Sequence, residues 1–298
     1  MNETMRAKTN IPQQSVQREG FPTTSLGGIE VSRLVVGTNW INGYSHKTAA
    51  ADQGIKDYNR LDRTNAAHML SVYLDAGVNV ILGGISPLVY DAVHEAEDKT
   101  GRKMYIINTP HFDTAGTPDA LRAAERAFDE DRRNGVTFCW PFNCTVEELL
   151  NKRDHTIERL PDYLRMIRER GMIPGLSAHM PEVLTYATEQ RYDIEGCIQI
   201  YNCLGFLMQM EVETVHQNIW DAHKPVLTIK PMAAGRITPL VGLNFVWNTI
   251  RPQDLVCAGC MTPGEALEVI EISRAAIERR RPQTFQRGSL GEVNSPLV

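Results

Sequence analysis

Short β-rich runs alternate with helical stretches along the chain, and this alternation limits the possible folds more than any other feature. The predicted helices include residues 62–76, 118–133, 146–170, 181–190, 209–223 and 263–280. The predicted strands are residues 34–37, 80–83, 104–107, 135–139, 173–177, 197–201, 226–229 and 255–258. Strands and helices in this order are typical of βα units around a parallel sheet. Eight such units predict an α/β fold, a (β/α)8 TIM barrel whose active site lies at the carboxyl ends of the strands.

The residues before the first βα unit predict a small cap on the barrel. Thr23–Leu26 and Ile29–Ser32 flank Gly27 and Gly28, which is the signal of a two-residue hairpin turn. We expect this N-terminal β-hairpin to cover the barrel floor, within one domain of residues 22–281. Residues 1–21 are expected to form a flexible arm, and residues 282–298 a C-terminal tail.

Two helix starts carry a capping box, in which a Thr at the N-cap is followed three residues later by Glu. The first pairs Thr145 with Glu148, and the second pairs Thr262 with Glu265. Each Thr is expected to cap the helix that follows it.

Composition points to an ordinary soluble protein of the cytoplasm. The formal net charge is −5, which leaves no basic footprint for nucleic acid or an anionic membrane. No apolar run approaches the roughly 20 residues of a transmembrane helix, and the N-terminus lacks the apolar stretch of a secretory signal. The six cysteines are scattered, which is typical of reduced, buried thiols. We therefore expect a small-molecule substrate as the partner, and the sequence leaves the oligomeric state open.

Five segments, in order, resemble the aldo-keto reductases over roughly residues 22–280. They are LGGIEVSRLVVGTNW (26–40), YLDAGVNV (73–80), IQIYN (198–202), IKPMAAGRI (229–237) and VCAGCMTPGEALEVIE (256–271). The third is similar to the family's sixth-strand Q-x-x-Y-N, and the fourth to its seventh-strand S-P-L-A-G-G. The fifth is similar to the last strand and the cofactor-binding helix. The resemblance implies a hairpin-capped barrel.

The residues that carry the family's carbonyl reduction are replaced here. The family's second strand leads into D-T-A-x-x-Y, but Leu82 and Pro87 stand at the Asp and Tyr positions. The family's catalytic Lys ends the third strand, and residues 107–111 contain no Lys. The family's catalytic His ends the fourth strand, and residues 138–141 contain no His. A carbonyl reductase needs a proton donor within about 3 Å of the nascent alkoxide. Neither Leu82 nor Pro87 can supply that proton.

The cofactor is left open by the sequence. Basic residues at the start of the last helix hold the 2′-phosphate of NADP in the family, whereas residues 260–273 contain three Glu and no Lys or Arg. We therefore do not expect tight binding of NADP through its 2′-phosphate. The sequence leaves open that NAD(P) binds through other contacts. Lys230, Arg236 and the free N–H groups at the helix start near Thr262 could instead hold a phosphate or a carboxylate.

Three histidines follow predicted strands or lie in the loop after the first one, and His is the usual acid or base near neutral pH. They are His46, His111 and His179, and all three are expected on the catalytic face. His46 lies in the long loop 38–61, which also contains Trp40 and Tyr44 and has the length of a lid.

Other side chains at the strand ends are candidates for binding a substrate or cofactor. Lys230 could hold an anion, which we favour, or form a Schiff base. Amides that end strands could recognise hydroxyl groups. The expected binding residues are Lys230, Arg236, Asn39, Trp40, Tyr44, Asn108, Gln199 and Asn202.

A divalent metal is less favoured. Asp113 is the carboxylate nearest to His111, with His179 as a third potential ligand, and sugar-isomerase barrels use more carboxylates than this. Cys257 and Cys260 form a C-x-x-C pair without a second pair nearby. We therefore predict no metal site.

Three functions remain open from the sequence. The first is an isomerase, epimerase or lyase that acts by proton transfer on a small polyhydroxylated or carbonyl compound, of the sugar or hydroxy-acid type, with His111 and His179 as the acid and base. The second is an atypical NAD(P)-dependent oxidoreductase with a relocated proton donor, His111 or Tyr44. The third is a barrel that binds a ligand without catalysis. The clustered His, Lys and Arg residues favour an enzyme over the third.

Overall fold

The computed structural model describes residues 20–61 and 64–283. A β-hairpin precedes the first barrel strand, formed by β1 (Thr23–Leu26) and β2 (Ile29–Ser32). Leu26 pairs with Ile29, so Gly27 and Gly28 are the two turn residues, with φ of 56° and 83°. Both angles lie in the left-handed region, which glycine enters without strain. The predicted hairpin is confirmed.

One parallel sheet forms the body of the molecule, and its strands match the predicted ones closely. They are β3 (Leu34–Gly37), β4 (Val80–Gly83), β5 (Tyr105–Asn108), β6 (Phe138–Cys139), β9 (Ile173–Pro174), β10 (Leu176–Ser177), β11 (Cys197–Ile200), β12 (Val226–Ile229) and β13 (Leu255–Ala258). β9 pairs with β6, and β10 pairs with β11. Because Gly175 alone separates β9 from β10, this fifth stretch of chain joins both edges and closes the barrel. The TIM barrel is confirmed.

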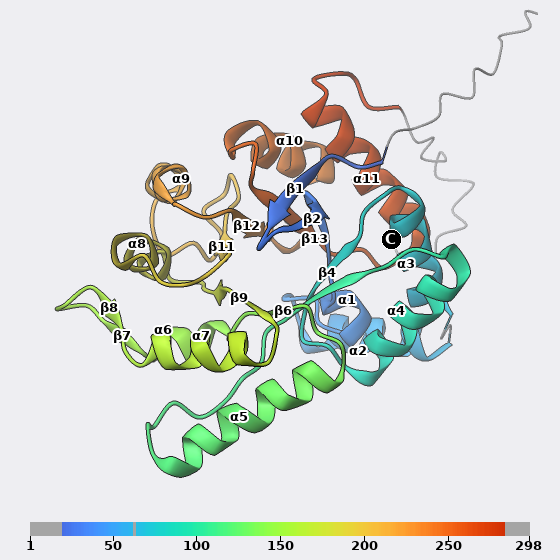
Figure 1. The fold of residues 1–298 in the computed structure, drawn as a ribbon. Coiled ribbons are helices and arrows are strands. Elements are labelled where there is room, and N and C mark those ends of the chain that lie inside the picture. Colours follow the sequence, from blue (N-terminus) through green and yellow to red (C-terminus); the bar gives the residue numbers. More distant parts are fainter. Residues whose placement is uncertain (1–19, 62–63, 284–298) are drawn as a thin grey trace, which may run out of the picture.

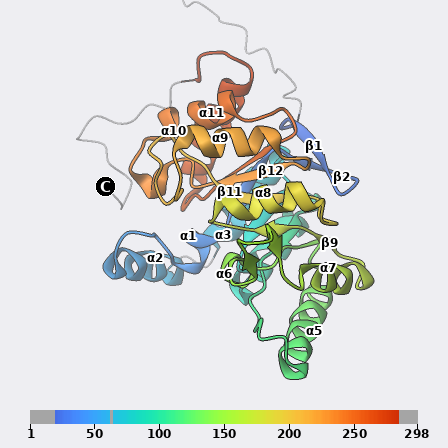
Figure 2. The same ribbon diagram turned by 90° about the vertical axis from the view of Figure 1, so that its left-hand side faces the viewer.

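Helices surround this sheet (Figure 1). They are α1 (Asn39–Asn42), α2 (Ala49–Leu61), α3 (Asn65–Asp75), α4 (Pro87–Thr100), α5 (Pro118–Arg133), α6 (Asn143–Glu147), α7 (Leu160–Glu169), α8 (Pro181–Gln190), α9 (Val212–Asp221), α10 (Pro239–Thr249) and α11 (Pro263–Ile277), with a 3₁₀ turn η1 (Ala233–Gly235). The β1–β2 hairpin crosses one end of the barrel, and α2 lies at the other end (Figure 2).

An inner core fills the barrel, with the hairpin residues Leu26 and Val31 as its plug. Trp140, at the end of β6, is fully buried in this core. A Cβ atom at Gly175 would lie 2.4 Å from the indole Cε2 of Trp140, so only glycine fits there. The close approach of the indole explains why the fifth strand is divided at this residue.

Helix α5 shows why several helices agree with their prediction. The Thr117 hydroxyl accepts a hydrogen bond from the N–H of Ala120, and Pro118 occupies the first turn. Ala120, Ala124 and Phe128 recur at a spacing of four and are buried against the barrel. Local caps and an apolar stripe both favour the same helix, so its bounds follow from the sequence.

The predicted helix 146–170 is wrong. It is divided into α6 and α7 by a small hairpin of β7 (Leu150–Asn151) and β8 (Thr156–Ile157). The Asn151 carboxamide oxygen accepts hydrogen bonds from the N–H groups of Arg153 and Asp154, each at 3.1 Å. This side-chain turn competes with helical bonding. Pro161 then fits the first turn of α7.

The two capping boxes differ in outcome. Thr145 lies inside α6 and is buried, with no hydrogen-bond partner found for its hydroxyl among the described residues, so the predicted cap there is wrong. The Thr262 hydroxyl accepts from the N–H of Glu265 at 3.2 Å, which confirms the cap of α11.

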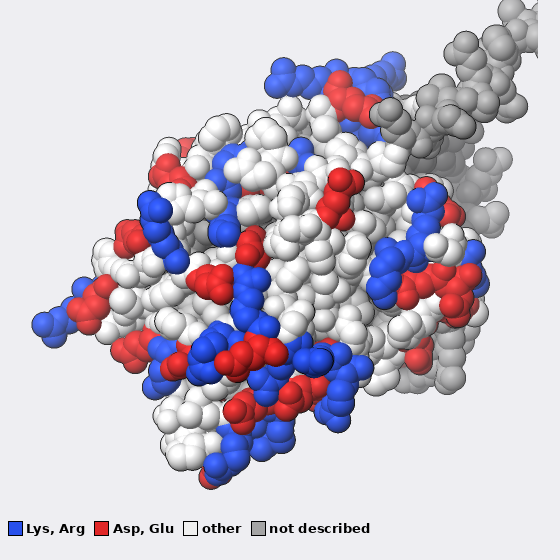
Figure 3. Space-filling view, in the orientation of Figure 1, with Lys and Arg blue, Asp and Glu red and all other residues white. Residues whose placement is uncertain are grey.

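The predicted flexible arm and tail fall mostly on residues 1–19 and 284–298, outside the described residues. Phe21, placed in the arm by the prediction, is buried, and its N–H donates to the Ala76 carbonyl at 3.0 Å. No described helix has the length and apolar character needed to cross a membrane. Lys and Arg are interspersed with Asp and Glu on the face shown in Figure 3.

Candidate active site

Lys230 follows β12 directly, at the carboxyl end of the barrel. Its ammonium is partly buried, and no hydrogen bond or ion pair of this group is found in the part of the chain that the structure describes. Burial lowers the pKa of Lys230. The neighbouring Cys257 thiol offers no counter-charge, because burial raises its own pKa to about 12. Lys230 is therefore a desolvated cation without a compensating anion.

His179 lies between β10 and α8 and is held from α6. The Glu147 carboxylate accepts hydrogen bonds from the N–H groups of His179 and Met180, at 2.5 and 2.9 Å. The Asn143 amide lies 3.4 Å from Nδ1 of His179. Burial first, and then the charges of Lys230 and His46, lower the pKa of His179 to about 4. The ring is neutral at pH 7, and with the Asn143 amide as donor its proton lies on Nε2.

His46 approaches the same place from the short loop between α1 and α2. The predicted long loop 38–61 is wrong for most of its length, because α1 and α2 occupy it. The Asn39 amide lies 2.7 Å from its Nε2. Asp52, near the start of α2, accepts from the N–H and hydroxyl of Ser45, at 2.6 and 2.5 Å, and thereby fixes the turn. Burial and then the Lys230 charge lower the pKa of His46, while Asp52 opposes them. His46 is thus also biased toward the neutral form.

His46, His179 and Lys230 form one electrostatic unit, which we name the mouth cluster. The charge of Lys230 acts on both imidazoles, and His46 acts on His179. The three residues come from three loops at the carboxyl ends of the strands. The cluster joins one cation to two neutral imidazoles, which suits the binding of an anion and the movement of a proton.

A strained turn borders the mouth cluster. Ala233, Ala234 and Gly235 have φ of 48°, 55° and 78°, and the left-handed region costs an alanine about 1–2 kcal/mol. The Lys47 ammonium lies against this turn, since a Cβ atom at Gly235 would be 3.0 Å from its Nζ. Arg236 stacks over Phe206 at 4.0 Å. Strain of this kind is typical of ligand-binding sites, and the two cations extend the positive surface of the mouth.

His111 does not join the mouth cluster. It is exposed in the loop after β5, and its ring meets the edge of Phe142 at 6.2 Å between centroids. None of the charges that shift the pKa of His46 or His179 comes from His111. The expected pairing of His111 with His179 is therefore replaced by a grouping of His46 with His179.

The amides of Asn108 and Asn202 hold loops. The Asn108 amide donates to Asp131 at 2.5 Å, and its oxygen accepts from the Ile85 N–H at 3.3 Å. The Asn202 oxygen accepts from the N–H of Phe206 at 2.9 Å, and its amide donates to the Phe206 carbonyl at 3.0 Å. Both residues shape the rim of the barrel, and their contact with a ligand stays a prediction.

Gln199 lies within β11 and is fully buried. Ile198 packs in the inner core, so the alternation of a strand turns Gln199 to the opposite side. In the pattern Q-x-x-Y-N, the Gln stands three residues before the Tyr, and the residue three before Tyr201 is Ile198. The glutamine is displaced by one position, which turns its amide away from the barrel interior.

Trp40 lies in α1, and Tyr44 lies in the loop after it that carries His46. The Trp40 ring covers Gly259, where a Cβ atom would lie 2.5 Å from its Cδ1. Tyr44 is exposed, with the Lys56 ammonium 5.5 Å from its ring centroid. Trp40 thus closes the mouth at the end of β13, whereas Tyr44 lies on the outer surface.

Two N–H groups at the start of α11 already have partners. The Thr262 hydroxyl occupies the N–H of Glu265, and the Glu265 carboxylate accepts from the Met261 N–H at 2.7 Å. The expectation of free N–H groups near Thr262 is therefore wrong at these two positions. Glu265 puts a negative charge at the start of α11.

Candidate metal ligands are dispersed. Among residues 20–61 and 64–283, no group of three or more His, Cys, Asp and Glu side chains could hold a metal ion. The Asp113 carboxylate accepts from the Ala115 N–H at 2.9 Å. Cys260 instead contacts the Tyr73 hydroxyl at 2.9 Å.

The positions that differ from the aldo-keto reductase pattern have structural roles. Leu82 is buried in the inner core, and Pro87 occupies the first turn of α4 behind the Ser86 cap. Leu82 has no proton to donate, and Pro87 lacks both a side-chain donor and an N–H.

Comparison with known proteins shows the fold. No family model and no curated protein matches the sequence. A putative aldo-keto reductase from Pseudomonas aeruginosa is similar in structure, with a TM-score of 0.63, 16% identity, and coverage of 89% of this chain and 99% of the other. An aldo/keto reductase from Klebsiella pneumoniae in complex with NADP and acetate has a TM-score of 0.55 and 15% identity, with coverage of 87% of this chain and 90% of the other. A putative 2,5-diketo-D-gluconic acid reductase B has a TM-score of 0.54 and 15% identity, with coverage of 91% of this chain and 95% of the other. The chain has the aldo-keto reductase-like barrel fold.

Proposed function

We propose that the chain is an enzyme that moves a proton on a small anionic carbonyl or polyhydroxylated compound, as an isomerase, epimerase or lyase. One observation carries the proposal: at the barrel mouth, a cation without a counter-charge lies among two imidazoles with lowered pKa values. Active sites are where such shifts gather, because catalysis needs groups that change protonation easily.

Lys230 holds the anionic group of the substrate in this proposal. A partly buried ammonium without a partner is unfavourable, and a carboxylate or phosphate would relieve it. Lys47 and Arg236 stand at the rim, where they add attraction for the same group. The substrate class is therefore anionic.

His179 polarises the substrate oxygen. Its Nδ1 is the acceptor for the Asn143 amide, so Nε2–H is left as a donor. A neutral imidazole that donates to a carbonyl stabilises the negative charge that develops when a neighbouring carbon loses its proton.

His46 accepts that proton at Nε2, which the Asn39 amide releases when the substrate binds. The proton leaves the carbon next to the carbonyl, and the electron pair of the broken bond forms the enediolate. The bound anion balances the charge of Lys230, so the pKa of His46 rises and its basicity increases. For isomerisation, Nε2 of His179 gives its proton to the former carbonyl oxygen and takes the proton of the neighbouring hydroxyl, while His46 returns its proton to the neighbouring carbon. For elimination, His46 gives its proton to the leaving group. No oxidant is consumed in either case.

NAD(P)-dependent reduction is the second candidate, and the similar structures favour it, since one of them contains NADP. The fit of this chain to NADP is poor at the α11 start, where Glu265 caps the helix and Trp40 covers Gly259. The relocated donors considered for this reaction are His111 and Tyr44, and neither is among the groups that shift the pKa of His46 or His179. A barrel that only binds a ligand is the third candidate.

Proton exchange tests the first candidate directly. The protein is incubated in D₂O with a panel of small hydroxy- and keto-carboxylates and sugar phosphates, and loss of the proton next to the carbonyl is followed by NMR. We expect exchange with at least one compound. The exchange rate should fall by about 10²-fold in His46→Ala and in His179→Ala, and it should stay unchanged in the matched control His111→Ala. Exchange unaffected by both cluster variants, or turnover that requires NAD(P)H, would contradict the proposal.

A further inference from the structure

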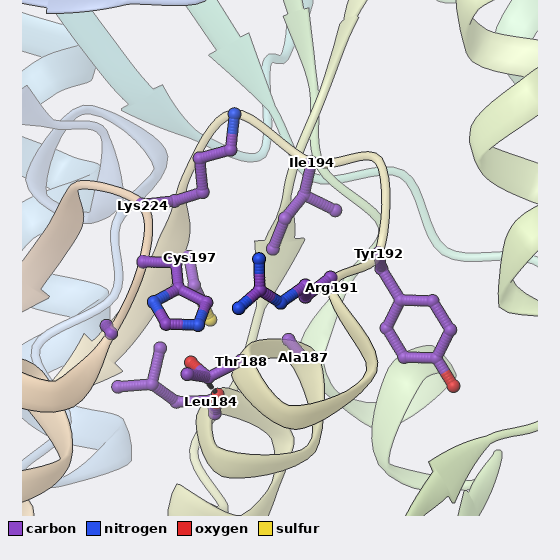
Figure 4. A pocket seen from close by; sticks show the side chains of 10 residues that line it. Leu184, Ala187, Thr188, Arg191, Tyr192, Ile194, Cys197 and Lys224 are labelled. Atoms are coloured by element: carbon purple, nitrogen blue, oxygen red, sulfur yellow. Dashed lines mark hydrogen bonds between the residues drawn. The ribbon is translucent and has the colours of Figure 1, made fainter.

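A pocket of about 200 Å³ opens between α8, the start of β11 and the end of α9 (Figure 4). Cys197 is the first residue of β11, and Lys224 lies two residues before β12. The pocket is therefore at the amino ends of the strands, whereas the mouth cluster is at their carboxyl ends. It is a separate site.

The inside of the pocket is apolar and its rim is cationic. Leu184, Ile194 and Cys197 line it and are buried, with exposed fractions of 3%, 4% and 1%. Arg191 and His223 line it and are exposed. This pattern suits a ligand with one apolar end and one anionic end.

The Arg191 guanidinium is available for such a ligand. Figure 4 shows it over the middle of the pocket, and no hydrogen bond or ion pair of its side chain is found among the described residues. Lys224 also lies at the rim, but its ammonium is paired with Glu195 at 2.9 Å. Arg191 is thus the group that can take a carboxylate with two parallel hydrogen bonds.

The backbone at Arg191 is in a left-handed conformation, which a glycine variant can use. Arg191 ends α8 with φ of 52°, in the left-handed conformation that helix ends usually assign to glycine. An arginine there carries backbone strain that glycine would avoid.

Two helix ends oppose an anion here and limit its charge. α8 and α9 both end at the pocket, and the carbonyl groups of helix C-termini repel negative charge. A single carboxylate with direct hydrogen bonds to a guanidinium overcomes this effect, since charge-assisted bonds are roughly twice as strong as neutral ones. A dianion gains no more such bonds from one arginine and is repelled more strongly.

We propose that this pocket binds a small monocarboxylate with a short apolar chain. The carboxylate pairs with Arg191, and the chain lies among Leu184, Ile194 and Cys197. A volume of 200 Å³ holds about seven water-sized groups at roughly 30 Å³ each. The ligand therefore has four to six carbons, as in butanoate, pentanoate or hexanoate.

Calorimetric titration of the full-length protein with hexanoate tests this. We expect saturable binding with a Kd on the order of 1 mM, and binding at least about tenfold weaker for hexanamide, acetate and inorganic phosphate. Equal binding of hexanamide would show that charge has no part, and equal binding of phosphate would show that the apolar chain has none. Either result, or no saturable binding of hexanoate, would overturn the proposal.

Arg191→Gly separates binding from folding. It removes the guanidinium and the backbone strain together, so we expect hexanoate affinity to fall about tenfold or more while the Tm rises. The matched control is Arg279→Gly, because Arg279 has φ of 53° and follows α11, away from the pocket. It should raise the Tm and leave the affinity unchanged.

Ala187→Leu tests the apolar part. Ala187 lines the pocket on α8, so a larger side chain fills the space and leaves Arg191 in place. Hexanoate binding should be lost while acetate binding stays as weak as before. Unchanged hexanoate affinity in both Arg191→Gly and Ala187→Leu would place the ligand elsewhere and refute the site.

Discussion

The two ends of the barrel treat positive charge in opposite ways. At the floor, the Arg251 guanidinium is 7% exposed, pairs with Asp254 at 2.7 Å, and also donates to the Lys224 carbonyl. At the mouth, Lys230 is partly buried, and the described residues give its ammonium no such partner. A buried cation with all its bonds made stabilises one arrangement of the chain. A buried cation that lacks such bonds is typical of a site that binds an anion.

The same contrast holds for backbone strain. The floor hairpin turns through Gly27 and Gly28, whereas the turn after β12 places Ala233 and Ala234 in the left-handed region. The floor hairpin uses the residue that the conformation favours, and the turn after β12 does not. Backbone strain and an uncompensated, partly buried charge thus lie close together in the chain at the mouth cluster.

The largest expected effect is at the floor. Arg251→Met leaves Asp254 buried without its cation, while the Val226 N–H still donates to it. We expect a loss of about 3–5 kcal/mol in the free energy of unfolding, measured by urea denaturation. A loss below about 1 kcal/mol would show that the floor pair contributes no more than a surface ion pair.

Lys230→Met is the matched change at the mouth, and its expected sign is opposite. Removal of a desolvated cation without a partner should leave stability unchanged or raise it by about 1 kcal/mol. Activity on the true substrate should fall by about 10²-fold or more, mainly through KM if Lys230 only holds the anion. Borohydride trapping of a substrate on Lys230 would instead reveal a Schiff base.

The pH dependence of stability should come partly from His179. Its pKa is about 4 in the folded protein, against an ordinary value of 6.5. Between these values the unfolded chain binds more protons, so stability rises with pH and is lost as pH falls from about 6.5 to 4. We expect about 2 kcal/mol from this group, allowing for its partial exposure.

His179→Asn should flatten that slope, while the exposed His111→Asn should not. Denaturant midpoints at pH 6.5 and 4.5 measure this change of stability with pH. NMR titration of the His179 ring gives its pKa directly. A ring pKa near 6.5 in the free protein would remove the basis for a neutral His179.

The smallest expected effects are at the left-handed turns. Ala234→Gly should stabilise the protein by about 1 kcal/mol, because glycine adopts φ of 55° without strain. Gly28→Ala should destabilise it by a similar amount, since no atom lies within 4 Å of the added Cβ and only the backbone at φ of 83° resists. Thermal unfolding of both variants measures the two changes in stability. Changes of the same sign would contradict the difference in backbone strain between the floor hairpin and the turn after β12.

The sequence by itself determined the barrel and the hairpin. Turn glycines, helix caps and the spacing of apolar residues are local signals, and around α5 and the β1–β2 hairpin they agree with one another. The predicted helix 146–170 failed because a continuous helical pattern hid the Asn151 turn, which needs a partner geometry that periodicity does not show.

Only the tertiary structure decided the site. The sequence named His46, His111 and His179, but nothing local tells which of them approach Lys230, since that depends on how each loop folds over the rim. His46 is directed by the Asp52–Ser45 bonds, whereas His111 is carried outward beside Phe142. The one-residue displacement of Gln199 can be read from the sequence, but the side of the sheet to which it turns the amide became visible only in β11, where the register is known. Local patterns fix elements, and the closure of the barrel decides which loop residues meet.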